Sequence, residues 1–224
     1  MIKNLIHNTK PIIFHAQGKL RFCPLWTKIK DVCSSSKKIP DGLSIVTFNN
    51  GNSFGGKEIG CFEKSIENQC VVMGKEITNW INSLKIQLTV EFLENAKSDY
   101  ILSADSSDVV VYSFDDIIES FENKKCQILY NAEMQCYPNR NNSEIEKSKF
   151  EKPFCHLNSG LWIGKRKFAL EFYKELSLAV NEKTISDQGC IREIYLKFYP
   201  EILIDDKCSI FQTLNGVNEK ILSV

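Results

Sequence analysis

Short apolar runs rich in β-branched and aromatic residues alternate along the chain with longer stretches whose apolar positions recur every three or four residues. The short runs predict strands at residues 11–15, 43–48, 100–104, 127–133, 160–164 and 201–205. The longer stretches predict helices at residues 78–97, 113–123, 166–180 and 186–198. Two polar segments, residues 33–40 and 139–152, predict irregular loops. This alternation is typical of an α/β fold with a mostly parallel central sheet flanked by helices.

Composition narrows the class of protein. The 224 residues are expected to form one domain, and 28 basic residues balance 28 acidic ones, so no nucleic-acid partner is indicated. The apolar runs are too short to cross a membrane, and the first residues lack the features of a secretory signal. Nine cysteines without a C-x-x-C pair indicate reduced thiols. A cytoplasmic location is expected.

A first candidate nucleotide site is "GNSFGGKE", Gly51 to Glu58, directly after a predicted strand. Its spacing approaches that of a phosphate-binding P-loop, but the residue after the lysine must carry a hydroxyl group for magnesium, and here it is Glu58. A carboxylate at this position would compete with phosphate. The P-loop interpretation is therefore rejected in favour of a glycine-rich connection.

A second candidate is "DSSD", in which Asp105 and Asp108 flank a short turn between two apolar runs. Ionised carboxylates are costly to bury unpaired. Magnesium and manganese prefer oxygen ligands and often bind one or two carboxylates together with substrate phosphates. An Asp-rich turn whose side chains bond nearby backbone is an equal alternative on these residues alone.

Five segments that occur in order carry a resemblance to a known family. They are "LSADSSDVVVYSFDDIIESF", "ILYNAEMQCYP", "FCHLNSGLWIGKRKFALEFYKEL", "SDQGCIREIYL" and "EILIDDKCSIFQTLNG". Together they resemble the glycosyltransferase domain of the procollagen lysine hydroxylases and related collagen glycosyltransferases, over roughly residues 85–216.

The resemblance implies a GT-A fold, a Rossmann-like sheet that binds a UDP-sugar and Mn²⁺ (or Mg²⁺) at the Asp-x-x-Asp turn. Asp105 and Asp108 match the two metal-binding aspartates. The donor would be UDP-glucose or UDP-galactose, and the acceptor hydroxylysine or galactosyl-hydroxylysine of a collagen-like protein. A cation would neutralise the diphosphate leaving group. Residues 41–216 would form the nucleotide- and acceptor-binding core.

Further donor-site residues are implied by the same resemblance. Thr47 matches a residue near the uridine, and Ser107 lies within the metal-binding turn. Trp80 matches an aromatic residue that stacks on uracil, with a packed Trp beside the following helix as an equal alternative. Lys85 resembles a lysine close to the phosphates, and a solvated helix lysine is its alternative.

Three residues are implied on the sugar and acceptor side. Asn158 and Asp187 match residues that line this pocket. Asp187 would orient or deprotonate the acceptor hydroxyl, or would simply cap the helix that begins beside it. Tyr137 stands where the family carries a tryptophan.

The sequence departs from the family in its histidine. The family completes its metal site with a His-Gly-Asn-Gly segment after the block that here reads "IFQTLNG", whereas this chain has no histidine after His156. The segment "KPIIFHAQGK" near the N-terminus has a similar pattern. We hypothesise a circular permutation in which residues 1–40 contribute His15 as the third ligand, with Gly18 and Lys19 near the diphosphate. A hydrogen-bonded structural histidine is the alternative for His15, and His156 is expected to be structural.

The sequence thus predicts a metal-dependent glycosyltransferase without nucleic-acid or membrane partners. Two alternatives stay open: an inactive module that binds a UDP-sugar or a protein, and a transferase that acts on a glycan rather than on a protein.

Overall fold

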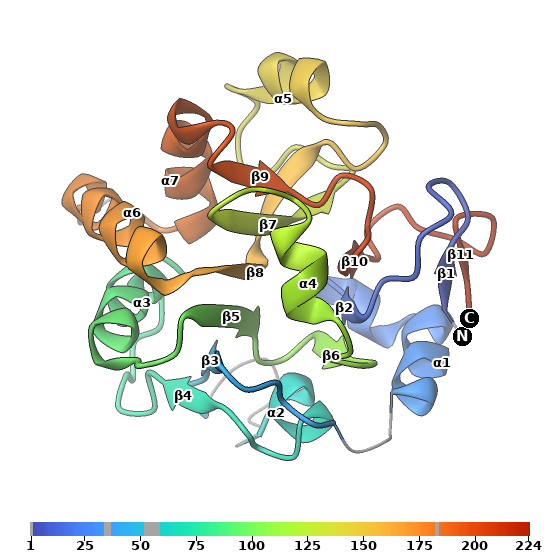
Figure 1. Ribbon diagram of the computed structural model, residues 1–224, viewed down its shortest axis with the longest axis horizontal. Helices are drawn as coiled ribbons and strands as arrows, with labels where there is room; N and C mark the ends of the chain where they lie inside the picture. Colours follow the sequence, from blue (N-terminus) through green and yellow to red (C-terminus); the bar gives the residue numbers. More distant parts are fainter. Residues whose placement is uncertain (1, 34–36, 52–58, 182–183) are drawn as a thin grey trace.

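The computed structural model describes residues 2–33, 37–51, 59–181 and 184–224. Its centre is a six-stranded sheet in which five strands run in one direction and β8 runs against them, so the sheet is mostly parallel as expected (Figure 1). The spatial order is β4 (Val71–Met73), β3 (Leu43–Phe48), β5 (Tyr100–Asp105), β8 (His156–Lys165), β7 (Ile128–Glu133) and β9 (Ile202–Ile204).

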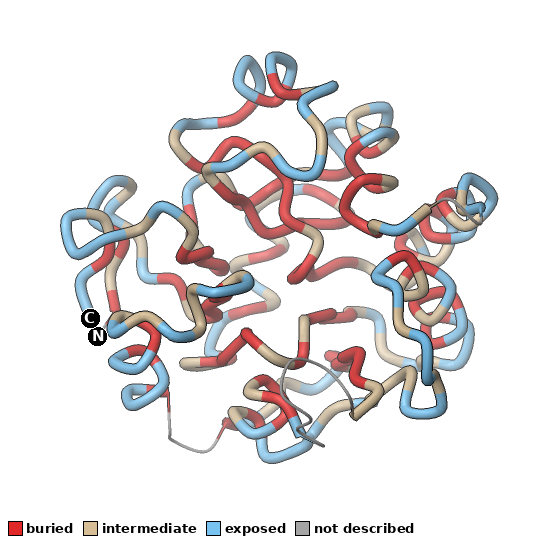
Figure 2. The backbone as a smooth tube through the Cα atoms, turned by 180° about the vertical axis from the view of Figure 1, so that it is seen from behind, coloured by how far each residue is buried: buried red, intermediate tan, exposed pale blue. Residues whose placement is uncertain are grey.

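Alternating side chains along the strands build a separate core on each face of this sheet. In β5, Ile101 packs into one core and Leu102 into the other. The first core lies under α3 (Leu84–Asn95), α6 (Arg166–Ala179) and α7 (Asp187–Ile194), and the second under α2 (Cys61–Ser65) and α4 (Ile117–Glu122). Figure 2 shows the buried residues concentrated along the strands and the inner sides of these helices.

A second, smaller sheet has three strands. Its order is β10 (Phe211–Thr213), β2 (Ile13–His15) and β6 (Val109–Val111). The N-terminal strand β2 thus runs parallel to β10 and antiparallel to β6, which follows the Asp-x-x-Asp turn. A third core joins this sheet to α1 (Pro24–Val32), with Trp26 and Phe14 both buried.

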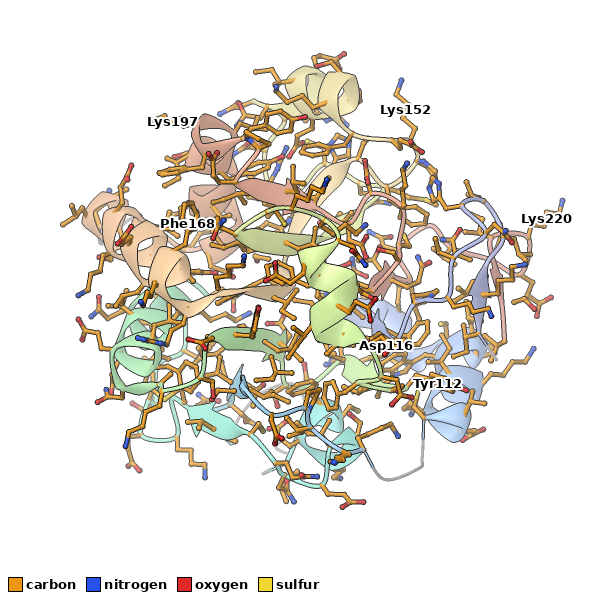
Figure 3. All side chains as sticks on the ribbon, viewed as in Figure 1. Tyr112, Asp116, Lys152, Phe168, Lys197 and Lys220 are labelled. Atoms are coloured by element: carbon orange, nitrogen blue, oxygen red, sulfur yellow. The ribbon has the colours of Figure 1, made fainter. Side chains whose placement is uncertain are left out.

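The remaining elements are short. The two ends of the chain pair as β1 (Lys3–Asn4) and β11 (Leu222–Ser223), and the helices η1 (Gly18–Phe22), α5 (Ser143–Lys149) and η2 (Tyr195–Phe198) fill connections. Lysines such as Lys152, Lys197 and Lys220 extend away from the body of the molecule (Figure 3). Within the described ranges, no helix has the length and apolar content needed to span a membrane.

Several expected boundaries were wrong. The segment 139–152 contains α5 rather than only loop, the helix expected from residue 78 begins at Leu84, and the strand expected at 160–164 extends back to His156. The apolar run after the Asp-x-x-Asp turn forms β6 (Val109–Val111), but the pattern missed α1, α2, β4 and β10, most of which are too short to show a period. The P-loop candidate lies mostly outside the described residues, as do residues 34–36 of the first expected loop.

Candidate active site

The Asp-x-x-Asp turn connects β5 to β6, so one carboxylate stands at the carboxyl end of a central strand and the other just before the small sheet. Register in the small sheet pairs His15 with Val109, directly after Asp108. His15 Nε2 consequently lies 3.4 Å from Asp108 Oδ1 and 3.9 Å from Asp105 Oδ2. The structure therefore brings together the three residues that the sequence proposed as metal ligands.

The chemistry of this cluster suits a divalent cation. Its three ligand atoms all lie within 4.8 Å of one another. Asp108 Oδ1 is buried and has no hydrogen-bond partner among the described residues. His15 Nδ1 lies 3.1 Å from the Asn158 side-chain oxygen, which also accepts from the Gly160 amide, so the hydrogen of the neutral ring belongs on Nδ1. Nε2 is then left as a ligand atom that faces the carboxylates.

The charged groups of the cluster shift one another's pKa values. Burial alone would lower the pKa of His15, but the carboxylates of Asp108 and Asp105 outweigh burial and raise it. Burial raises the pKa of Asp105 despite the nearby Lys85 ammonium. The pKa of Asp108 is lowered, because His15 and Lys85 together outweigh the effect of burial. Such a cluster of titratable groups that shift one another's pKa values is typical of a functional site.

Gly160 lets β8 approach this cluster closely. A Cβ atom at this position would collide with His15 Cε1 and would come within 2.7 Å of Asp105 Oδ2. The glycine of the "LNSG" segment is thus required by space rather than by backbone conformation.

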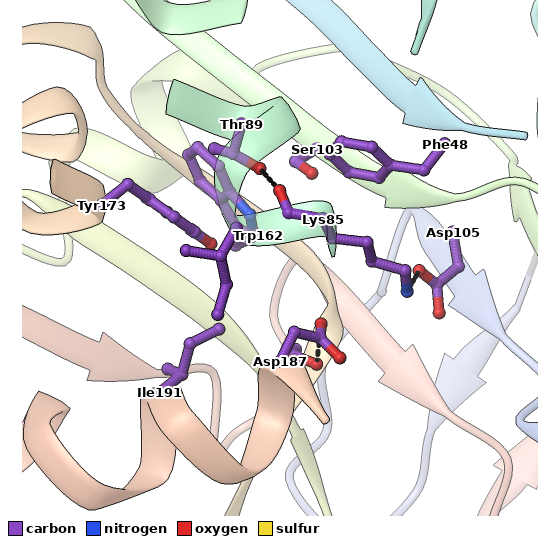
Figure 4. A pocket seen from close by; sticks show the side chains of 11 residues that line it. Phe48, Lys85, Thr89, Ser103, Asp105, Trp162, Tyr173, Asp187 and Ile191 are labelled. Atoms are coloured by element: carbon purple, nitrogen blue, oxygen red, sulfur yellow. Dashed lines mark hydrogen bonds and ion pairs between the residues drawn. The ribbon is translucent and has the colours of Figure 1, made fainter. Parts of the chain in front are cut away.

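Lys85 links the metal cluster to Asp187. Its ammonium lies 2.5 Å from Asp105 Oδ1 and its side chain is 14% exposed. Burial would lower the pKa of Lys85, but Asp105 and Asp187 outweigh it, so the side chain stays charged. The lysine lies in the first turn of α3 yet points into the site, which excludes the solvated-helix alternative. Figure 4 shows its ammonium between the carboxylates of Asp105 and Asp187.

Asp187 begins α7 and is buried. Ser186, not Asp187, caps this helix by accepting from the Gly189 amide, which overturns the capping alternative. The Asp187 carboxylate instead accepts from Ser159 Oγ at 2.8 Å. Behind Lys85 and Asp187 a cavity of about 10 Å³ has room for about one water molecule.

A large open cavity of about 740 Å³ lies in front of these residues. That volume is within the range of small-molecule sites. Many of the side chains that line it are polar. Aromatic side chains also line it, among them the exposed Tyr137 and the half-buried Trp80. The sequence-predicted residues that line it are His15, Gly18, Trp80, Lys85, Asp105, Ser107, Asp108, Tyr137, Asn158 and Asp187.

Two predicted donor-site residues do not line this cavity. Thr47 is fully buried and its hydroxyl donates to the Ala104 carbonyl oxygen, so it joins two central strands. Phe48, the next residue, takes the place at the cavity wall. Lys19 is exposed in η1, one residue beyond Gly18. In each case the adjacent residue in the chain, Phe48 or Gly18, lines the cavity instead.

Sequence reasoning missed a buried carboxyl group in the cavity wall. Glu133 ends β7 and accepts from Gln188 Nε2 at 2.9 Å, Asn158 Nδ2 at 3.2 Å and Gln17 Nε2 at 3.3 Å. Burial raises its pKa, although these bonds oppose the rise. The signal was available, since Glu133 belongs to the "ILYNAEMQCYP" segment and is the last residue of an apolar strand.

A second group of potential ligands lies elsewhere and comprises Cys136, Glu146 and His156. The Arg192 guanidinium occupies its centre, with Nη2 2.6 Å from Glu146 Oε2 and 3.0 Å from Cys136 Sγ. His156 Nδ1 lies 2.7 Å from the same carboxylate oxygen, and Tyr195 donates to the other. These contacts satisfy the group internally, so His156 has the structural role expected for it.

The chain matches a family model described as "PLOD GT domain" over residues 71–223. It is 28% identical over 133 residues to the procollagen-lysine,2-oxoglutarate 5-dioxygenase of Drosophila melanogaster, a match that covers 57% of this chain and 18% of that protein. The chain thus spans less than a fifth of the length of that relative.

Two solved structures are also similar to the chain. Mouse xyloside xylosyltransferase 1 has 13% identity and a TM-score of 0.40, with 85% of this chain and 82% of that chain covered. 4-Diphosphocytidyl-2C-methyl-D-erythritol synthase from Anaerococcus prevotii has 12% identity and a TM-score of 0.38, with 73% and 89% covered.

A mostly parallel sheet flanked by helices, with an Asp-x-x-Asp turn at the carboxyl end of a central strand, is the α/β arrangement that was expected for a GT-A domain. Because the family model covers more than half of the chain, the chain belongs to the PLOD glycosyltransferase-domain family. The fold and family expected from the sequence are both confirmed.

Proposed function

We propose that this domain transfers a hexose, glucose or galactose, from a UDP-sugar to an acceptor hydroxyl group with the help of Mn²⁺ or Mg²⁺. The single observation that supports this best is the cluster of His15, Asp105 and Asp108 at the edge of the large cavity, in a member of a glycosyltransferase family. One nitrogen beside two carboxylates suits Mn²⁺ better than Mg²⁺. A bound cation would neutralise charge on the diphosphate leaving group.

The residues of the chain itself would position the reactants. Lys85 would compensate negative charge between the metal turn and Asp187, and Gly18 and Ser107 would contact the diphosphate. Trp80 and Phe48, rather than Thr47, would flank the nucleotide. Lys19 would reach the phosphates by turning its exposed side chain toward them.

The acceptor side would centre on Asp187. Its buried carboxylate would accept the proton as the acceptor oxygen forms a bond to the anomeric carbon and the bond from that carbon to the UDP oxygen breaks. Asn158 would act mainly by orienting His15 and Glu133, since it contacts both side chains. Tyr137, at 61% exposure on the cavity mouth, would contact the sugar or the acceptor.

The acceptor would be hydroxylysine or galactosyl-hydroxylysine of a collagen-like protein, and a glycan is the second candidate. Support for the first comes from the name of the Drosophila relative, a procollagen-lysine dioxygenase. We also propose that the chain is a single domain that works in the cytoplasm. All nine cysteines lie in the described ranges as free thiols, which suits a reducing compartment.

The decisive experiment measures UDP release from separate UDP-sugars with Mn²⁺, with and without a hydroxylysine peptide. Release is expected to require Mn²⁺, to favour one donor and to fall at least 100-fold in Asp108→Ala, because one of two carboxylate ligands is lost. Glu94→Gln, a surface carboxyl group on α3, is the matched control. No release from any donor by the folded protein would contradict the transferase and favour the binding module.

A further inference from the structure

The short helix α2 is bonded to the metal-binding turn at several points. The Phe62 amide donates to the Ser106 carbonyl oxygen at 2.9 Å. On the far side of the turn, the Val111 amide of β6 donates to Ser65 Oγ at 3.2 Å. The helix therefore contacts both the turn and the strand that follows it.

Glu63 supplies the central contact of this arrangement. Its side chain is buried, with the residue only 2% exposed. Ser106 Oγ donates to the carboxyl group, at 2.7 Å from Oε1 and 2.8 Å from Oε2, and Asn49 Nδ2 donates to Oε1 at 2.9 Å. Asn49 Nδ2 also lies 3.0 Å from Ser106 Oγ, which closes a triad of three side chains.

The triad joins two parts of the proposed donor site. Ser106 lies between the two metal-site aspartates, while Asn49 follows β3 and accepts from the Gly51 amide at 2.8 Å. Asn49 and Ser106 both line the large cavity, but Glu63 stands behind them and does not. Glu63 therefore contacts the cavity wall without being available to a ligand.

The segment that begins α2 packs closely against the metal-binding turn. A Cβ atom on Gly60 would collide with both Ser106 Oγ and the Ser106 carbonyl oxygen, and would lie 2.6 Å from Glu63 Oε2. A backbone oxygen cannot move aside as a flexible side chain can. Gly60 thus permits the approach that the triad needs.

We propose that Glu63 is a positioning residue that holds the Asp105–Asp108 turn in a conformation ready for the cation, and that couples this turn to the nucleotide end of β3. The proposal rests on the proposed function of the same site. Glu63 lies outside residues 71–223, so the family match says nothing about it. Residues that support metal ligands from behind typically change metal affinity 10- to 100-fold when replaced.

Glu63→Gln tests the proposal with almost no change in size. The substituted amide offers one acceptor oxygen in place of two, so at least one of the three contacts that Asn49 and Ser106 make to the carboxyl group is lost whichever way the amide lies. Asn49→Asp combined with Glu63→Gln exchanges donor and acceptor and restores the complementarity. Glu67→Gln, an exposed carboxyl group just beyond α2, is the matched control.

The measurement is a titration of the protein with Mn²⁺ in the absence of any sugar donor. The concentration of free Mn²⁺ is monitored through its electron paramagnetic resonance signal. Glu63→Gln is expected to weaken Mn²⁺ binding about tenfold, and the double variant to recover most of that loss. The control is expected to bind as the unmodified protein does. If Glu63 had a merely structural role, its replacement would lower thermal stability, and the double variant would not recover the affinity for Mn²⁺.

The outcomes separate this inference from the proposed function. If the unmodified protein binds no Mn²⁺, the proposed metal site fails. If it binds and Glu63→Gln binds equally well, the positioning role of Glu63 is overturned. Should Glu63→Gln fail to fold, Ser106→Ala removes the same contact from the turn side, and unchanged Mn²⁺ affinity in that variant would equally overturn the proposal.

Discussion

The metal cluster depends on close packing at single residues in addition to charge. Replacing Gly160 with Ala would push a methyl group against the His15 ring and Asp105 Oδ2. We expect Mn²⁺ affinity to fall at least tenfold while the melting temperature changes by only a few degrees, because the rest of β8 is untouched. Isothermal titration with Mn²⁺ measures the first quantity and thermal unfolding the second.

Gly164→Ala, four positions along the same strand, provides the control. Its methyl group would lie 3.0 Å from the Gln127 carbonyl oxygen, far from the cavity-lining residues. It should lower stability without altering Mn²⁺ affinity. Equal loss of affinity in both variants would contradict the specific crowding of His15 by residue 160.

A second single residue, Asp205, forms an ion pair with Lys124 that makes the stability of the fold depend on pH. Burial opposes ionisation of Asp205, but Lys124 at 2.9 Å and the amides of Phe211 and Ile210 outweigh burial and lower its pKa. A lowered folded-state pKa means that the stabilisation is complete above the ordinary Asp value, about 3.9. It is lost as the pH falls through the lower folded-state value.

Asp205→Asn is therefore expected to lower the free energy of unfolding by about 3 kcal/mol at pH 7, since it leaves Lys124 without its partner. The difference from the unmodified protein should shrink as the pH drops below about 4. Urea unfolding at pH 7 and at decreasing pH measures it. A difference that stays constant with pH would contradict the ion-pair explanation.

At the level of elements, α7 holds the segment that carries Tyr137. Arg192 Nη1 donates to the carbonyl oxygens of Tyr137 at 3.1 Å and Asn139 at 2.5 Å, while its other nitrogens bind Glu146. Arg192 is 1% exposed, so its replacement leaves the fully buried Glu146 carboxylate short of a cation. One side chain thus ties together α7, α5 and the cavity mouth.

Arg192→Met is expected to lower the free energy of unfolding by about 3 to 5 kcal/mol, because it breaks a buried pair. Glu146→Met combined with Arg192→Met should recover part of that loss, since an apolar pair leaves no uncompensated charge. Chemical unfolding of the single and double variants measures this coupling. If the two effects simply add, the two side chains do not act as a pair.

The sequence predicts long, periodic elements far better than short ones. The apolar positions of α6 and the β-branched runs of β3 and β5 predicted those elements nearly as they stand, because their periods repeat over a whole face. The five-residue helix α2 has no room for a period, so Glu63 could not be recognised as a neighbour of Ser106, 43 positions away. Likewise, no local sequence pattern predicts the contact between Glu146 and Arg192, which are 46 positions apart.

At the scale of the whole molecule, the site depends on a strand from the opposite end of the chain. Asp105 and Asp108 could be proposed from two residues in one turn, whereas His15 required the resemblance of a distant segment to the family pattern. Strand pairing then brings the N-terminal β2 beside β10, near the C-terminus. The side-chain directions were not predictable, since Thr47 faces between strands while Phe48 reaches the cavity.

The proposed circular permutation makes a prediction for the entire fold. Pairing of β1 with β11 places Lys3 opposite Ser223, so the two ends of the chain lie together. A variant in which a short Gly-Ser linker joins Val224 to Met1, with new ends between the partly exposed Pro40 and the exposed Asp41, would place β2 after β10 in sequence. That is the order of the family pattern.

We expect this rearranged chain to fold, to melt within a few degrees of the unmodified protein and to bind Mn²⁺ within about threefold, because no contact of the three-stranded sheet changes and permutation at exposed connections is generally tolerated. Thermal unfolding and Mn²⁺ titration test both expectations. His15→Ala in each chain order is the control and should weaken binding equally in both. A rearranged chain that folds yet loses Mn²⁺ binding would mean that the connection from β2 through η1 to residue 41, and not the strand pairing alone, orients His15.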